Sequence, residues 1–364
     1  MILDRYFARR FAGILSGVLG IFALIVGFVG LVDQLRRFSD SEASFGQLFA
    51  LALLALPQGI YDILPLIVIL ATIALFLGLA RSSELVVTRA AGRSALRAIV
   101  PPVMVALIVG CLAVAVLNPI VAATAREYEA RSTALSGEGS VLALGETGLW
   151  LRQGNAAGQT VIHAERANLA GTELQGVTFL TFAPEGGPVS RIAAETATLS
   201  DGAWVLHDAK TWPLARDTTP EALAARAESL RVPSTLTPAE IRNSFGTPAS
   251  IPIWDLPAFI DRLQAAGFSA QRHQVWLQIE LAQPLFLVAM VMIGAAFTLR
   301  PQRGGRTGMM VLFAILLSFA IYFLRNFAQI LGENGELPAV LAAWGPPLAA
   351  IGLSLGLLLH QEDG

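Results

Sequence analysis

Long apolar runs separated by short polar stretches dominate the chain. Six of them are long enough to cross a bilayer, whose core of about 30 Å needs roughly 20 apolar residues in a helix. They cover residues 11–32, 60–80, 98–123, 276–299, 308–331 and 338–360. Pro57 and Pro65 are expected to interrupt the approach to the second run, which would leave 45–56 as a separate interfacial segment. The pattern predicts six transmembrane helices.

Between the third and fourth runs the pattern becomes that of short strands. β-like segments at 148–152, 160–164, 176–183, 191–199 and 204–209 are separated by turn-prone stretches. This spacing is typical of an all-β sandwich or open barrel. Residues 255–266 then form an amphipathic pattern that ends at Gly267. We therefore expect an α-helical integral membrane protein with six transmembrane helices (3+3): helices one to three in 1–132, an inserted all-β domain in 133–240, and a connector with helices four to six in 241–364.

The arginines are distributed unequally between the two sides of these runs. One set of flanks holds Arg5, Arg9, Arg10, Arg81, Arg89, Arg93, Arg97, Arg300, Arg303 and Arg306. The opposite short loops hold only Arg36 and Arg37. Because cytoplasmic flanks carry the excess of basic residues, both termini are predicted to be cytoplasmic and the β-domain to lie across the membrane.

Composition agrees with the membrane class and excludes several chemistries. Apolar residues make up 54% of the chain and charged residues 14%, against roughly 25% charged in soluble domains. The net charge of −2 gives no basic field for nucleic acid. Lys210, the single lysine, lacks the glycines of a phosphate-binding Walker A loop. The four histidines show no metal-ligand spacing, and Cys111 reads as a packing residue. We expect no catalytic residue, no metal and no bound cofactor, and hence no enzyme.

The basic loop after the second run predicts a short helix near 82–92. Ser82 or Ser83 could cap its start, and Gly92 could end it. Two interpretations are open for this helix. Its apolar face, which includes Leu85 and Val86, could dock on a partner protein. Alternatively, Glu84 only complements the helix dipole, worth about 0.3–1 kcal/mol, and the apolar face lies on the bilayer.

Charged residues near the predicted outer ends of the runs form a second group of interest. Arg36, Arg37 and Arg126 lie there, and headgroup anchoring is the simplest account of them. Arg325 lies within the fifth run, where charge is costly and usually meets a cavity or a partner. It could face an anionic substrate or pair within the chain.

Four motifs resemble a known family. They are Leu3-Asp-Arg-Tyr6, Val32-Asp-Gln-Leu35, Arg81-Ser-Ser-Glu-Leu-Val-Val87 with Arg89-Ala-Ala-Gly92, and Gln283-Pro-Leu285. In this order and context the chain resembles the lipopolysaccharide-export permeases of the LptF/LptG type, and it looks closer to LptG. The likeness covers the whole chain, with three helices on each side of a β-jellyroll.

The resemblance implies the permease subunit of an ABC transporter in the bacterial inner membrane. Such a subunit extracts lipopolysaccharide and passes it to a periplasmic bridge protein of the LptC kind. Its implied partners are a paralogous LptF-like permease, as a heterodimer, and two copies of a cytoplasmic LptB-like ATPase, which hydrolyses the ATP. The β-domain would lie in the periplasm.

The resemblance also assigns roles to residues. The implied ATPase-coupling residues are Glu84, Leu85, Val86 and Arg89. Among the candidate substrate-binding residues, the resemblance supports Arg36, Arg37 and Arg126, and Arg325 is added because of its charge within the fifth run. The sequence departs from the LptG pattern at Gly30, which stands where such chains can carry a lysine.

Two other classes of function compete with this one. A secondary transporter would be favoured by midspan acid pairs and an inverted repeat, and neither is clear in the sequence. A membrane-anchored periplasmic scaffold would use only its β-domain. Co-purification with an ATPase would separate the permease from both.

Overall fold

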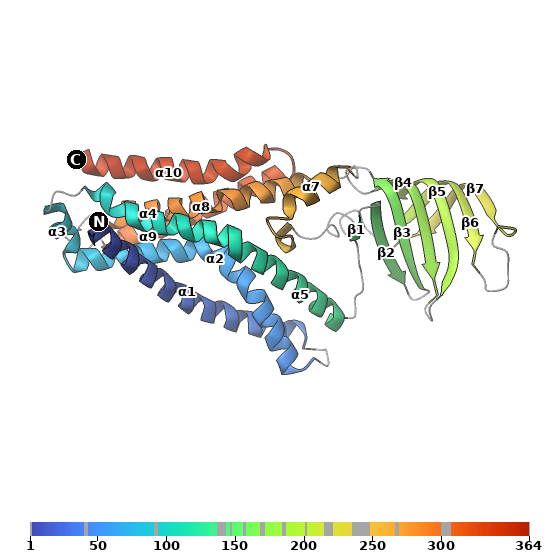
Figure 1. Ribbon diagram of the computed structural model, residues 1–364, viewed down its shortest axis with the longest axis horizontal. Coiled ribbons are helices and arrows are strands. Elements are labelled where there is room, and N and C mark those ends of the chain that lie inside the picture. Colours follow the sequence, from blue (N-terminus) through green and yellow to red (C-terminus); the bar gives the residue numbers. More distant parts are fainter. Residues whose placement is uncertain are drawn as a thin grey trace. The chain divides into compact units, whose positions relative to one another are not determined.

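The computed structural model describes the chain in two compact units (Figure 1). The described residues are 2–39, 43–90, 94–136, 143–145, 148–155, 158–167, 172–183, 187–200, 202–214, 221–234, 248–265, 269–299 and 307–363. The membrane unit contains 1–135, 249–254 and 271–364, and the β-unit contains 136–248 and 255–270.

Within the described residues, six helices of the membrane unit are long and apolar enough to cross a membrane, which confirms the predicted number. The first three spans are α1 (Ile2–Arg37), α2 (Phe45–Arg81), and α4 (Ala95–Leu112) continued by η1 (Ala113–Leu117) and α5 (Asn118–Ser136). The last three are α8 (Gln271–Thr298), α9 (Thr307–Glu333) and α10 (Ala339–Asp363). α1 and α2 are 36 and 37 residues long, and the third span includes a 37-residue stretch from Leu96 to Ser132, so all three exceed the roughly 20 residues that a bilayer core requires.

The second helix is continuous, so the expected separate segment at 45–56 is wrong. Ser44 starts α2 with a capping box shared with Gln47, and the helix then runs through Pro57 and Pro65. Figure 1 shows α2 bent along its course. Proline is tolerated inside membrane helices because neighbouring helices and small adjustments satisfy the freed backbone groups. Pro65 is itself buried, so the packing around α2 holds it in the helical path.

The third span contains a π-helical turn between α4 and α5. Such a turn accommodates one extra residue and often marks a functional position. Asn118 directly follows it and is 2% exposed. Its Oδ1 accepts a hydrogen bond of 2.9 Å from the backbone N–H of Ile253, and the Ala115 carbonyl accepts one of 3.2 Å from Trp254 Nε1. The segment that returns from the β-unit is therefore fixed to this turn.

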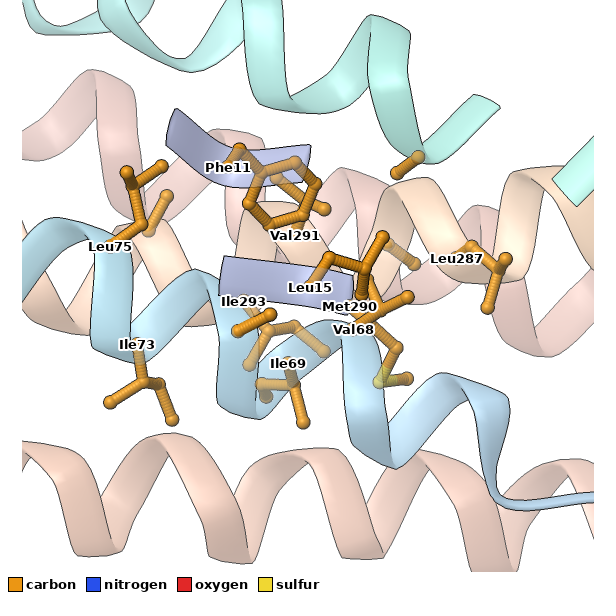
Figure 2. Packing of buried hydrophobic residues seen from close by; sticks show 14 of the residues in the cluster. Phe11, Leu15, Val68, Ile69, Ile73, Leu75, Leu287, Met290, Val291 and Ile293 are labelled. Carbon is orange, nitrogen blue, oxygen red and sulfur yellow. The ribbon is translucent and has the colours of Figure 1, made fainter. Parts of the chain in front are cut away.

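The core of the membrane unit gathers around α8. Figure 2 shows Phe11 and Leu15 of α1 beside Val68 and Ile69 of α2 and Met290 of α8. Helix α4 also approaches α8 closely: a Cβ added at Gly110 would lie 2.5 Å from the Cα of Pro284. Only a glycine permits that backbone approach, because 2.5 Å is far below van der Waals contact.

The β-unit is one antiparallel sheet of seven strands in sequential order. The strands are β1 (Ala143–Gly145), β2 (Gly148–Asn155), β3 (Gly158–Ala167), β4 (Glu173–Phe182), β5 (Pro188–Ser200), β6 (Ala203–Pro213) and β7 (Ala225–Pro233). Four of the five predicted segments lie within strands β2, β3, β5 and β6, and the fifth, 176–183, runs one residue past the end of β4. Trp204 and Phe179, both fully buried, meet edge-to-face with centroids 6.3 Å apart. The amphipathic helix expected after the sheet is α7 (Leu256–Ala265).

Candidate functional site

The short helix predicted after the second span is α3 (Glu84–Ala90). α2 ends at Arg81, and Ser82 is its C-cap residue. Ser83 has φ of 57°, a left-handed conformation that is uncommon for a side chain other than glycine. The backbone N–H of Val87 then bonds to the Ser83 carbonyl at 3.2 Å. This sharp turn makes Glu84 the first residue of a helix that leaves the direction of α2.

Glu84 is held by three side chains of its own chain. Arg10 Nη1 donates to Oε1 at 2.7 Å and lies 2.9 Å from Oε2. The Tyr6 hydroxyl donates to Oε2 at 2.9 Å, and the Ser82 hydroxyl donates to Oε1 at 2.7 Å. Two of these donors come from the first turns of α1. The loop glutamate therefore joins α3 to the N-terminal end of the first membrane helix.

These donors stabilise the charged form of the carboxyl. The hydrogen bond from Ser82 holds the pKa of Glu84 below its ordinary value, and the bonds from Arg10 and Tyr6 and the charge of Arg10 act in the same direction. Because the pKa is lowered on folding, the contribution of these contacts to stability is complete above the ordinary pKa and is lost as the pH falls through the lowered one. At neutral pH the carboxylate is charged and the cluster is intact.

The apolar residues of α3 are divided between the interior and the surface. Leu85 is 4% exposed and belongs to the core of the membrane unit, so its expected place on an unpartnered face is wrong. Val87 is instead the exposed apolar residue, at 67%. Thr88 is buried and donates to the Glu84 carbonyl at 2.7 Å. The side chains of Val86 and Arg89, also expected to couple, lie outside the described part of the chain, as does Gly92.

Three of the four candidate substrate residues lie at the end of α1 and in the middle of α5. Arg36, Arg37 and Arg126 are all exposed. Arg37 Nη1 donates to the Tyr128 hydroxyl at 3.3 Å, and that hydroxyl donates to Gln34 Oε1 at 3.3 Å, so the end of α1 is joined to α5. We refer to Arg36, Arg37 and Arg126 as the basic group. Its guanidinium groups have no carboxylate within ion-pairing distance among the described residues.

Arg325 lies apart from the basic group, in a buried polar cluster of the membrane unit. Its guanidinium carbon is 4.7 Å from the ring centroid of Phe286, and it interacts electrostatically with Glu280 and Asp62. Glu280 is 2% exposed and accepts a hydrogen bond from the Tyr61 hydroxyl. The charge of Arg325 thus has carboxylates of its own chain in the same unit, and its role in substrate binding stays a prediction.

Sequence analysis identified Arg325 in this part of the membrane unit but not the neutral polar residues of the same unit. Tyr61 of α2 donates to Glu280 of α8, and Asn118 of α5 is buried and accepts a hydrogen bond from the backbone of Ile253. Neither Tyr61 nor Asn118 carries a sequence signal for this role, since an isolated tyrosine or asparagine in an apolar run has many other uses. No group of three or more metal-binding side chains occurs within the described ranges.

Comparison with known proteins decides among the classes of function. The family model described as "Lipopolysaccharide export system permease LptF/LptG" matches residues 5–360. The chain belongs to this permease family. Two proteins named "Lipopolysaccharide export system permease protein LptG" are similar along their whole length. The one from Escherichia coli (strain K12) is 25% identical with 99% of each chain covered, and the one from Haemophilus influenzae is 24% identical with the same coverage.

Family membership establishes the general function of the chain. The chain is a multi-pass membrane protein and a permease subunit of a lipopolysaccharide export system. It is a component of a transporter rather than an enzyme. Its similarity to LptG agrees with the motifs that pointed to that member of the pair.

Proposed function

We propose that the chain is the LptG-like half of an ABC transporter in the bacterial inner membrane, with its β-unit in the periplasm. It pairs with an LptF-like permease, and two copies of a cytoplasmic LptB-like ATPase drive export toward an LptC-like bridge. The observation that carries the ATPase proposal is α3, a seven-residue helix between two membrane helices, set in the arginine-rich flank. It presents an exposed Val87 beside the partly exposed Glu84.

Val87 provides the direct test of ATPase docking. Val87→Asp should lower the amount of ATPase that co-purifies with the detergent-solubilised complex by at least about tenfold, because even a neutral polar group buried without a partner costs about 1–3 kcal/mol and a carboxylate costs more. Val189 is a matched control, since it is half exposed but lies on β5 of the other unit. If equal amounts of ATPase are recovered with Val87→Asp and Val189→Asp, α3 is not part of the interface with the ATPase.

The basic group is proposed to bind the phosphates of lipopolysaccharide. An arginine fork donates two parallel hydrogen bonds to a phosphate, and the exposure of these side chains leaves the forks accessible. The arginine asymmetry of the flanks would place the group toward the periplasmic leaflet. Hydrogen bonds of Tyr128 with Arg37 and Gln34 join α5 to the end of α1 that carries two of these arginines.

The orientation can be checked by labelling from one side of the membrane. In a Cys111→Ala background, a cysteine at Val189 should react with a membrane-impermeant maleimide in intact spheroplasts. One at His360 should react only after permeabilisation. Both positions are exposed, so access alone separates them. The reverse pattern would invert the topology and with it the direction of export.

A further inference from the structure

The contact between α1 and Glu84 joins two parts of the chain that the sequence separates widely. Tyr6 and Arg10 lie one turn apart on α1, at the i and i+4 spacing that places side chains on one face. They meet a residue 78 and 74 positions later. The guanidinium carbon of Arg10 also lies 5.6 Å from the ring centroid of Tyr6. We call Tyr6, Arg10 and Glu84 the latch.

The Glu84 carboxylate accepts hydrogen bonds from several donors of its own chain. A carboxylate has about four lone-pair sites. Two contacts from Arg10, one from Tyr6 and one from Ser82 are directed at Glu84. The rotation of the Glu84 side chain is therefore set by α1 as well as by its own helix. A force that displaces α3 acts on α1 through charge-assisted hydrogen bonds, which are about twice as strong as neutral ones.

Helix α1 can follow a displacement of α3, because few of its side chains are buried within its own chain. Its buried residues are Phe7, Phe11, Leu15 and Gln34, near its two ends. A Cβ added at Gly20 would meet nothing within 4 Å. The helix has no break between Arg10 and Arg36, a distance of about 40 Å at 1.5 Å per residue. It therefore connects the latch to the end that carries the basic group.

The positive-inside charge pattern does not by itself explain why residue 10 is an arginine. Arg5 and Arg9 lie in the same flank, are exposed, and supply the same charge to the positive-inside pattern. The Arg10 side chain is 30% exposed, and it passes beside Gly78 of α2, where an added Cβ would lie 3.8 Å from its Nη2. The site at the end of α2 thus accommodates this particular guanidinium.

We propose that Arg10 and Tyr6 are positioning residues for ATPase coupling: they fix Glu84 and transmit the movement of α3 to α1. The proposal rests on the proposed docking of α3 on an ATPase. It adds a route by which nucleotide-driven movement of α3 reaches the end of the first helix that carries Arg36 and Arg37.

The test uses the whole complex, with partner permease and ATPase, in liposomes containing lipopolysaccharide. The quantity measured is lipid exported per ATP hydrolysed. Arg10→Gln should lower this ratio by about fivefold or more, the lower end of coupling between distant sites. Tyr6→Phe should lower it less. Arg10→Lys, which keeps the charge, should restore part of it, and Arg9→Gln should match the unmodified chain.

A double variant, Arg10→Gln with Glu84→Gln, tests whether Arg10 acts through Glu84 or independently of it. If Arg10 acts through Glu84, the double variant should export no less per ATP than Glu84→Gln alone. Additive losses, or an unchanged ratio in Arg10→Gln, would overturn the proposal. The latch has its own readout in the chain without an ATPase: hydrogen exchange of the α3 backbone should rise in Arg10→Gln and not in Arg9→Gln. Failure of ATPase co-purification would instead count against the proposed function.

Discussion

Replacing Arg36, Arg37 and Arg126 together with alanine should remove most of the lipopolysaccharide that co-purifies with the chain. A hydrogen bond to a charged group contributes about 1.5–3 kcal/mol, and 1.4 kcal/mol corresponds to a factor of ten in affinity. We therefore expect binding to fall at least roughly tenfold, even if the three guanidinium groups share their contacts. Assembly with the partners should survive, because these side chains are exposed and none belongs to the core.

The measurement is the amount of lipid recovered with the purified complex and captured by a photo-crosslinker at Leu35. That residue is 40% exposed in the same turn of α1. Arg97→Ala is the control, since Arg97 is also exposed but lies at the start of α4. A silent crosslinker and unchanged lipid recovery in the triple variant would reduce the basic group to an anchor for membrane headgroups.

Trp204→Ala should destabilise the β-unit by about 3–5 kcal/mol, the usual cost of truncating a buried tryptophan. Trp204 is fully buried, pairs across the sheet with Leu199 and Val232, and meets Phe179 edge-to-face. Because a domain of this size is stable by only about 5–15 kcal/mol, much of that margin would be lost.

Hydrogen exchange of strands β4 to β6 in the detergent-solubilised chain measures this loss. Trp150→Ala provides the comparison. Trp150 is 41% exposed and contacts His163 with tilted rings whose centroids are 4.4 Å apart, so its removal should cost only about 1 kcal/mol. Equal protection in the two variants would mean that the buried face of the sheet does not depend on Trp204.

The sequence was sufficient for the architecture because hydropathy and arginine placement are local signals. The six membrane helices and five strand segments follow from the lengths and periods of the apolar runs. The continuity of α2 through Pro57 and Pro65 was not predictable in this way. Whether a proline ends a membrane helix depends on the packing of the neighbouring helices, which no local pattern records.

The site was only partly predictable, for a related reason. Glu84 stood out through its loop, but its partners Tyr6 and Arg10 lie more than seventy residues away. Arg10 is one of ten arginines in the basic flanks, and the positive-inside pattern accounts for all ten in the same way. Its specific contact with Glu84 therefore could not be distinguished in the sequence. Leu85 was wrongly predicted to lie on an outer face. Which face of α3 packs against the core depends on the left-handed turn at Ser83, and the sequence has no glycine at that position to indicate such a turn.

The π turn of the third span has a consequence for chain length. Deleting one residue there, such as Ala115, would allow α4 and α5 to join as one regular α-helix. Because the turn absorbs its extra residue locally, α5 would keep its phase, and Asn118 would still face the backbone of Ile253. The same deletion in the regular part of α4, for example at Val105, would instead rotate everything after it by about 100° and move it by about 1.5 Å. The π turn is therefore the place in the third span where the chain can change length by one residue without turning α5.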